Sequence, residues 1–196
     1  MLWSTAAPAQ EPKPLRERRG AYLSGAVGAG YFFAEEDYTR LDGTAQGTET
    51  WRGGVVRTRM QFGGTIARGV IVGIEFGGVI GAGRYTDDAQ LQATSFEDDG
   101  ALIGPVVQLF VQPMLPGDLF VRVGVGGTYV QHLSAGAGSS GAGGSAAIGW
   151  LKPLAPGFNL GASIVLDGYI SDDADDVFER DGSGFIPSVN LEAVAF

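Results

Sequence analysis

The chain has 196 residues, enough for one domain, and its 33 glycines are more than twice the usual share of about 7%. It contains no cysteine, which excludes a disulfide framework, a zinc–thiolate site and a thiol nucleophile. The net charge of −9 argues against nucleic acid as a partner, because binding to phosphates needs clustered Lys and Arg.

Residues 1–19 are interpreted as a truncated signal remnant followed by a flexible polar lead-in. Ala7-Pro8-Ala9 before Gln10 has the small-x-small pattern of a secretory cleavage site. The alternative for these residues is an ordinary polar tail. The segment QEPKPLRERRG that follows is polar and proline-rich, which predicts a flexible connection.

Eight segments alternate apolar with small or polar residues, which is the period of a β-strand. In chain order they are Ala21–Phe33, Gly54–Ile66, Gly69–Gly83, Ala101–Gln112, Leu119–Val130, Gly144–Leu151, Asn159–Ile170 and Gly184–Phe196. Most of them span more than ten residues, whereas strands of globular proteins usually have about 5–6. The sequence therefore predicts an all-β chain with unusually long strands.

The segment GVIVGIEFGGVIGAG (Gly69–Gly83) separates the strand interpretation from a membrane helix. As a helix it would rise about 22 Å, which is short of the roughly 30 Å hydrocarbon core. As a strand it reaches about 50 Å, and a tilt of about 45° leaves about 35 Å across a bilayer. Its glycines share one strand face with Glu75, and the other face is apolar.

The connections between the segments alternate in length. The short ones are Ala67–Gly69, Pro113–Asp118 and Pro153–Phe158, and the long ones are Glu35–Thr50, Tyr85–Asp99, Ser134–Gly141 and Ser171–Gly182. Two short connections contain Pro-Gly, which suits a type II turn, and the glycine-rich stretch Gly136–Ala146 is expected to be flexible. Alternating turns and loops predict an eight-stranded antiparallel up-and-down barrel over residues 20–196.

Charge placement favours a transmembrane β-barrel over a soluble one. Six charges fall well inside predicted strands: Arg57, Arg59, Glu75, Arg122, Asp167 and Glu192. A soluble, lipocalin-like barrel would need many more charges, above all Lys, on a wetted outer face, whereas a membrane barrel has an apolar exterior. The soluble carrier of a lipophilic ligand remains the alternative.

The six strand charges, three arginines and three acids, are the candidate ion pairs of a narrow lumen. Buried charges are costly unless they are paired. A tight turn at Arg68 makes Arg59 a diagonal cross-strand neighbour of Glu75, with Arg57 as a second candidate. The pair is either an ion-conducting gate or a structural plug, and we favour the plug, because barrels of this size are filled by their own side chains.

With these strands, Pro-Gly turns, long loops and the terminal Phe196, residues 20–196 resemble the small eight-stranded outer-membrane proteins of the OmpX and OmpW kind and the membrane domain of OmpA. The resemblance implies a monomer in the Gram-negative outer membrane, with both termini in the periplasm. It also implies contact with outer-membrane lipid and lipopolysaccharide, and insertion by the barrel-assembly machinery. One departure is that the parity of Phe196 leads back to Val194 and Glu192, so either a bulge shifts the last strand or the assembly signal is weak.

Two features are candidates for chemistry. His132 and Ser134 in QHLSAG resemble the His and Ser of the lipid A deacylase PagL, which is also an eight-stranded barrel. A serine nucleophile needs a base and an orienting acid, and the next acid after His132 is Asp167. In the acidic run, Asp172, Asp173, Asp175 and Asp176 are weak candidates for a divalent cation, and a solvated acidic face is the simpler interpretation.

The sequence thus predicts an integral outer-membrane barrel without a cofactor and without enzymatic activity. Its role would be structural or based on binding by the loops, and polar side chains would plug its lumen. Passage of small solutes through the barrel is one alternative, and a lipid A deacylase that uses His132 and Ser134 is another.

Overall fold

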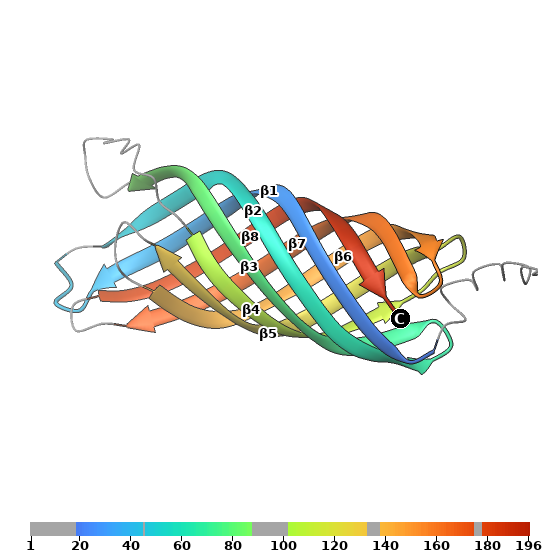
Figure 1. Ribbon diagram of the computed structural model, residues 1–196. Helices are drawn as coiled ribbons and strands as arrows, with labels where there is room; N and C mark the ends of the chain where they lie inside the picture. The colour runs from blue at the N-terminus through green and yellow to red at the C-terminus, as the bar shows by residue number, and fades with distance from the viewer. Residues whose placement is uncertain (1–18, 45, 88–101, 133–137, 175–177) are drawn as a thin grey trace, which may run out of the picture.

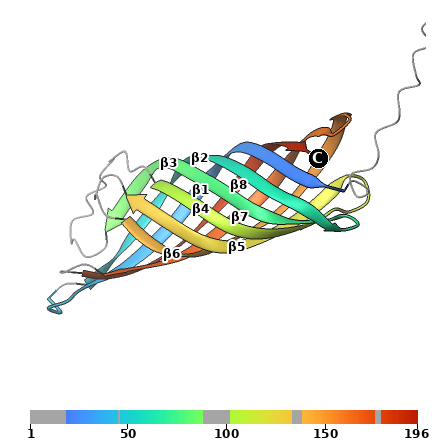
Figure 2. The ribbon, with the colours of Figure 1, turned by 60° about the horizontal axis from the view of Figure 1, so that its bottom comes forward.

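The computed structural model describes residues 19–44, 46–87, 102–132, 138–174 and 178–196, and these form one closed barrel (Figures 1 and 2). The strands are β1 (Ala21–Arg40), β2 (Gln46–Ala67), β3 (Val70–Asp87), β4 (Leu102–Pro113), β5 (Leu119–His132), β6 (Gly138–Ala155), β7 (Phe158–Ala174) and β8 (Phe178–Ala195). Each strand pairs antiparallel with the next, and β8 returns to pair with β1. The predicted all-β, eight-stranded up-and-down barrel is confirmed.

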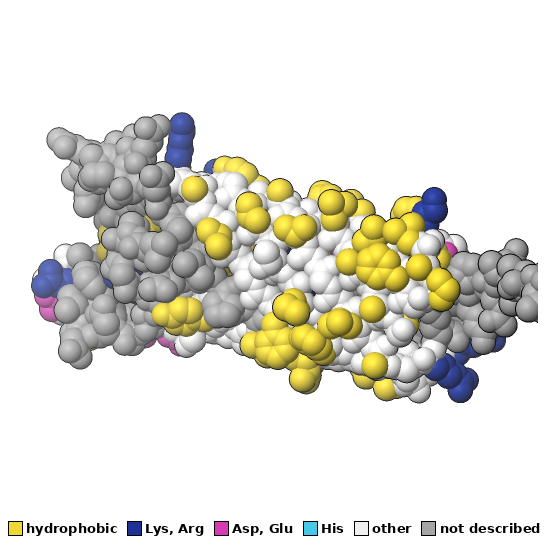
Figure 3. Space-filling model, viewed as in Figure 1, with side chains coloured by type: hydrophobic (Ala, Val, Ile, Leu, Met, Phe, Trp, Pro, Cys, Tyr) yellow, Lys and Arg dark blue, Asp and Glu magenta, His cyan; other side chains and the backbone are white. Residues whose placement is uncertain are grey.

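The side chains that point out of the barrel are apolar over a broad central band. Val27, Val56, Leu109, Val125, Ile164 and Leu191, from six different strands, are between 52% and 69% exposed. Figure 3 shows hydrophobic side chains along the wall, with charged side chains only toward the two ends of the face in view. A continuous apolar exterior of this kind faces lipid, so the soluble-carrier alternative is wrong.

No helix in the described part of the chain is long and apolar enough to cross a membrane. Seven of the eight strands, in contrast, are longer than the sequence predicts, and β4 has the predicted length of 12 residues. Most of the predicted loops Glu35–Thr50 and Ser171–Gly182 are continuations of β1, β2, β7 and β8. The alternation of apolar and polar residues does not predict these extensions, because polar residues occupy both strand faces beyond the apolar band. The pairing of β1 with β2 nevertheless continues there, and Thr48 donates a hydrogen bond to Asp37 at 2.7 Å.

The glycine-rich stretch Gly136–Ala146 is a second correction, because from Gly138 onward it forms the first half of β6. The predicted loop Ser134–Gly141 is shortened for the same reason. A Cβ atom on Gly141 would lie 1.9 Å from the carbonyl oxygen of Ile170 on β7. Glycine therefore permits the close approach of two strands here. The high glycine content of this stretch is a feature of a tightly packed strand and not of a flexible loop. Of the predicted loop Tyr85–Asp99, residues 88–99 lie outside the described residues.

Three short turns join strands at the end of the barrel where the chain terminates (Figure 1). Gly69, Gly117 and Gly157 occupy these turns with φ of 71°, 77° and 79°. Gly117 and Gly157 each follow a proline, and the predicted type II turn needs φ > 0 at this position. The predicted tight turns are therefore confirmed.

The last strand pairs with β7 in one continuous register from Phe158↔Ala195 to Ala174↔Glu179. A bulge in β8, one of the two explanations for its odd parity, is therefore wrong. Glu192 and Val194 point inward and are buried, and the ring of Phe196 packs edge-on against Tyr22 with ring centroids 5.4 Å apart. The terminal phenylalanine thus contributes to the barrel interior at its short-turn end.

Two apolar clusters fill the interior, one toward each end. The cluster at the short-turn end contains Tyr22, Ile71, Phe110, Met114, Phe120, Ala147, Leu151, Val165 and Val194. The cluster at the long-connection end contains Phe32, Ala34, Trp51, Val55, Val79, Val130 and Ile186. The polar side chains between these clusters are buried, and Glu75, Gln112 and Arg122 have no accessible surface.

The outward apolar band predicts a depth-dependent effect of charge. Val125→Arg, in the middle of the band, should destabilise the barrel by about 2–4 kcal/mol, because the charge must enter hydrocarbon. Thr39→Arg, at an outward position of β1 beyond the band, should have little effect. Urea unfolding of the refolded proteins in phosphatidylcholine vesicles, followed by tryptophan fluorescence, measures both, and equal losses would contradict the assigned band.

Candidate functional site

A polar layer lies inside the barrel between the two apolar clusters. Its members are buried side chains from seven strands: Arg57, Arg59, Gln61, Glu75, Gln108, Gln112, Arg122, Ser145, Ser163, Asp167 and Glu192. Strand alternation brings them together, because every second residue of each strand points into the closed ring. The layer is the one place in the described barrel where several titratable groups are buried together.

Glu192 of β8 is the first carboxylate of the layer, and it accepts hydrogen bonds from three residues. Arg59 Nη2 donates to its Oε1 at 2.7 Å, and Arg122 Nη2 donates to the same oxygen at 3.1 Å. The hydroxyl of Ser163 also donates to Oε1. Charge-assisted bonds of this kind offset much of the free energy that is lost when a carboxylate leaves water.

Glu75 of β3 is the second carboxylate. Gln61 Nε2 donates to its Oε2 at 2.5 Å. Three arginines surround it at ion-pair distance: Arg57 Nη2 at 3.5 Å, Arg59 Nε at 3.6 Å and Arg122 Nε at 3.8 Å. The side chain has no accessible surface, so the arginines and Gln61 replace its hydration.

The third carboxylate, Asp167 of β7, accepts a hydrogen bond from Arg57 Nη2 at 2.8 Å. This contact joins β2 to β7 across the lumen. With it, three arginines and three carboxylates form one connected, neutral network. Removing one member leaves an uncompensated buried charge, which typically costs about 3–5 kcal/mol.

All six charges singled out in the sequence lie in this network. The register pairs Gln61 with Glu75 and so makes Arg59 the diagonal neighbour of Glu75. Gln61 and Ser163, which donate to the two glutamates, are not among the residues predicted from the sequence. Their alternating positions along the strands could have identified them: Gln61, for example, shares a strand face with Arg57 and Arg59.

The other candidate residues are not brought to the polar layer. His132 is the last residue of β5, where it pairs with Leu102, and Ser134 lies outside the described residues, so their use in catalysis stays an untested alternative. Asp172 and Asp173 belong to β7, and Asp175 and Asp176 lie outside the described residues. Among the residues that the structure describes, no group of three or more His, Asp or Glu could hold a metal ion.

Eight closed strands with an apolar exterior and a charged, polar interior define a transmembrane β-barrel of the bacterial outer-membrane class. The solved structure of the outer membrane protein OprG from Pseudomonas aeruginosa has this fold, with a TM-score of 0.53 and 13% identity over 90% of this chain and 98% of OprG. The fold and the lipid-facing band place this protein in the bacterial outer membrane.

Two further solved structures are similar at comparable identity. The outer membrane protein AlkL in lipid bilayers is 13% identical, with a TM-score of 0.49 over 98% of this chain and 96% of AlkL. Neisserial surface protein A is 14% identical, with a TM-score of 0.47 over 90% of this chain and 99% of that protein. No family model and no curated protein sequence matches this chain.

The network predicts a large loss of stability when one charge is removed. Arg122→Met should destabilise the barrel by about 3–5 kcal/mol, because it leaves Glu192 and Glu75 with fewer cationic partners. Combining Arg122→Met with Glu192→Gln restores charge balance, so the double variant should be more stable than Arg122→Met alone. Denaturant unfolding in detergent micelles gives both values.

The control is Arg40→Met, which removes an exposed ion pair with Asp42 at 3.1 Å and should change stability little. Losses from Arg122→Met and Arg40→Met of the same size would show that burial of the lumen charges has no energetic consequence.

Proposed function

We propose that the protein is a monomeric, non-enzymatic outer-membrane barrel with a closed lumen, and that it acts through the strands and loops beyond the membrane. The observation that carries the proposal is the burial of the polar layer. Glu75, Gln112 and Arg122, from three different strands, each have 0% exposure. A water-filled route past these side chains would leave part of their surface accessible.

The apolar clusters on either side of the layer support the same conclusion. Phe32 and Trp51 lie on the long-connection side, and Phe110 and Phe120 lie on the short-turn side. An ion that entered from either end would first cross an apolar region and then meet a network whose charges are already paired. The network is therefore best explained as a structural plug.

The proposed orientation places the long connections outside the cell and both chain termini in the periplasm. β1, β2 and β8 then extend as a sheet beyond the membrane, with the acids Glu35, Asp37, Glu49, Glu179 and Asp181 on it. Such an acidic surface attracts divalent cations and basic groups, which makes it suited to contact lipopolysaccharide through bridging cations. Insertion would use the barrel-assembly machinery.

The closed lumen predicts the absence of conductance. Wild-type protein in planar lipid bilayers should give no channel steps above those of protein-free bilayers, and Glu75→Gln and Arg59→Ala should not alter the record. A large porin reconstituted in the same way is the positive control. Regular steps in the wild type that change with Glu75→Gln would favour passage of small solutes through the barrel instead.

The proposed lack of enzymatic activity predicts unchanged lipid A. Cells that overproduce the protein should contain lipid A with its full set of acyl chains, as measured by mass spectrometry. His132→Ala and Ser134→Ala are the matched variants and should give the same spectrum. Loss of one acyl chain with the wild type, but not with these variants, would establish the deacylase alternative.

A further inference from the structure

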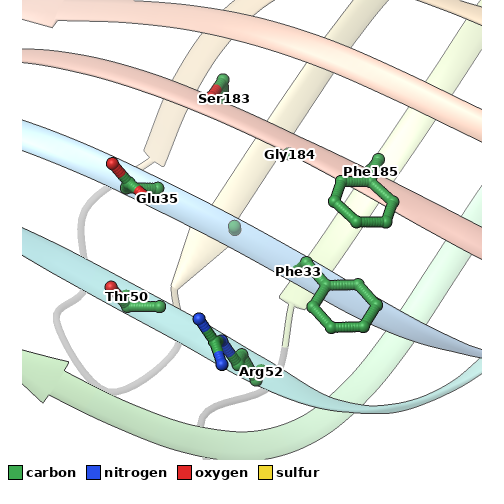
Figure 4. Close-up of a pocket in the computed structure, with 8 residues that line it drawn as sticks. Phe33, Glu35, Thr50, Arg52, Ser183, Gly184 and Phe185 are labelled. Carbon is green, nitrogen blue, oxygen red and sulfur yellow. The ribbon is translucent and has the colours of Figure 1, made fainter.

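One row of residues that runs across four strands lies at the edge of the apolar outer wall. The register aligns Phe185 of β8, Phe33 of β1, Arg52 of β2 and Arg84 of β3, all at outward positions. Figure 4 shows Phe185, Phe33 and Arg52 in line across three neighbouring strands. On these four strands the outward residues beyond the row are polar, so the row marks the edge of the lipid-facing band on this part of the wall.

The two arginines of this row stand directly opposite each other on β2 and β3. Like charges at paired positions of a sheet destabilise it. Among the residues that the structure describes, neither Arg52 nor Arg84 has an ion-pair partner. An anion held between the two guanidinium groups would remove the repulsion, and the flat, forked guanidinium is well suited to bind phosphate.

The wall beside the arginines is hollowed. The next outward pair toward the membrane is Gly54 and Ala82, and a Cβ atom on Gly54 would meet nothing within 4 Å. A hollow of about 450 Å³ is lined by Tyr31, Thr50, Arg52 and Arg84. There is thus room for a headgroup beside both guanidinium groups, with a threonine at the same hollow.

A second hollow of about 460 Å³ lies on the β1 and β8 side of Arg52 and contains an acid. Phe33 and Phe185 line it with rings stacked 4.6 Å apart, and Glu35 lies one row further from the membrane (Figure 4). The Glu35 carboxylate disfavours an anion at its side of the row. The position between Arg52 and Arg84 is therefore the more favourable one for an anion.

We propose that Arg52 and Arg84 bind a phosphate of lipid A, the anionic glycolipid of the outer leaflet, with its acyl chains on the apolar band below. Val56 and Ile80, which follow Gly54 and Ala82 toward the middle of the membrane, are 56% and 63% exposed and offer that apolar surface. A soluble phosphate would match the two charges but would leave this adjoining apolar surface unused. Aromatic side chains at the level of the headgroups, here Tyr31 and Phe33, are typical of a membrane boundary.

This inference rests on the proposed orientation, in which the long connections face outside, but it does not depend on a closed lumen. Protease treatment of intact cells tests the orientation separately. A binding assay on purified protein is insensitive to orientation, so the two can fail independently.

The test is a titration of the full-length folded protein in detergent with bisphosphorylated lipid A, read by native mass spectrometry. Arg52→Gln combined with Arg84→Gln should lower the apparent affinity about tenfold or more, because two charge-assisted contacts are lost. Arg40→Gln combined with Arg68→Gln removes the same charge away from the row and should bind like the wild type. Compact gel migration before boiling verifies folding, and Arg84→Gln alone is the milder variant, with a smaller loss expected.

Two ligand controls identify the source of the phosphate. Lipid A without its phosphates should bind the wild type as weakly as phosphorylated lipid A binds the double variant, and inorganic phosphate should compete only at far higher concentration. Equal binding of phosphorylated lipid A by the wild type and by Arg52→Gln with Arg84→Gln would overturn the site. Equal binding of lipid A with and without its phosphates would also overturn the site. If inorganic phosphate competed at the same concentration as lipid A, the ligand of the site would be free phosphate and not the lipid.

Discussion

Pairing of the buried charges in the lumen is the constraint on which the rest of this barrel depends. A charge without a partner in such an environment costs several kcal/mol, so the three arginines and three carboxylates need fixed neighbours. Those neighbours lie far apart in the chain: Arg57 meets Asp167, and Arg122 meets Glu192. Strands β2 and β7, or β5 and β8, come within reach across the lumen only when the sheet is closed. Closure of the ring and neutralisation of the charges therefore require each other.

The polar layer also explains the distribution of apolar residues. Lipid supplies the apolar environment of the outer wall, so burial of hydrophobic side chains inside is needed only where the lumen would otherwise admit water. The two clusters around Phe32 and Phe120 occupy those positions and separate the paired charges from both ends. Glycines such as Gly141 let neighbouring strands approach closely enough for a narrow interior of this kind. If the lumen is closed, as proposed, the surfaces left for function are the outer wall and the strands beyond the membrane.

At the membrane boundary the same alternation of strand faces has a different consequence. Outward positions there meet the headgroup region, where an arginine keeps its charge and an aromatic ring finds a suitable boundary. Arg52 and Arg84 end the apolar band on their strands, and the extended sheet with Glu35 and Asp37 begins just beyond. Basic residues at the edge of the membrane and acidic residues above it form two neighbouring surfaces of opposite charge on the same strands. In the proposed orientation, these two surfaces face the phosphorylated headgroups of the outer leaflet.

The sequence by itself determined the number of strands, their direction and the side of the wall on which each residue lies. The period of two is a local property, and the turn glycines Gly117 and Gly157 adopt φ > 0 wherever the turn stands. The position of each charge within a predicted strand, on the face opposite the apolar residues, was sufficient to select all six lumen charges. The tertiary structure alone decided how far the strands continue beyond the membrane, because sequence alternation disappears once polar residues occupy both faces. It also decided which residues meet, as in the pairing of Gln61 with Glu75 and of Arg52 with Arg84. Such contacts depend on register and on closure of the ring, and both are set by the pairing of strands and not by any single segment.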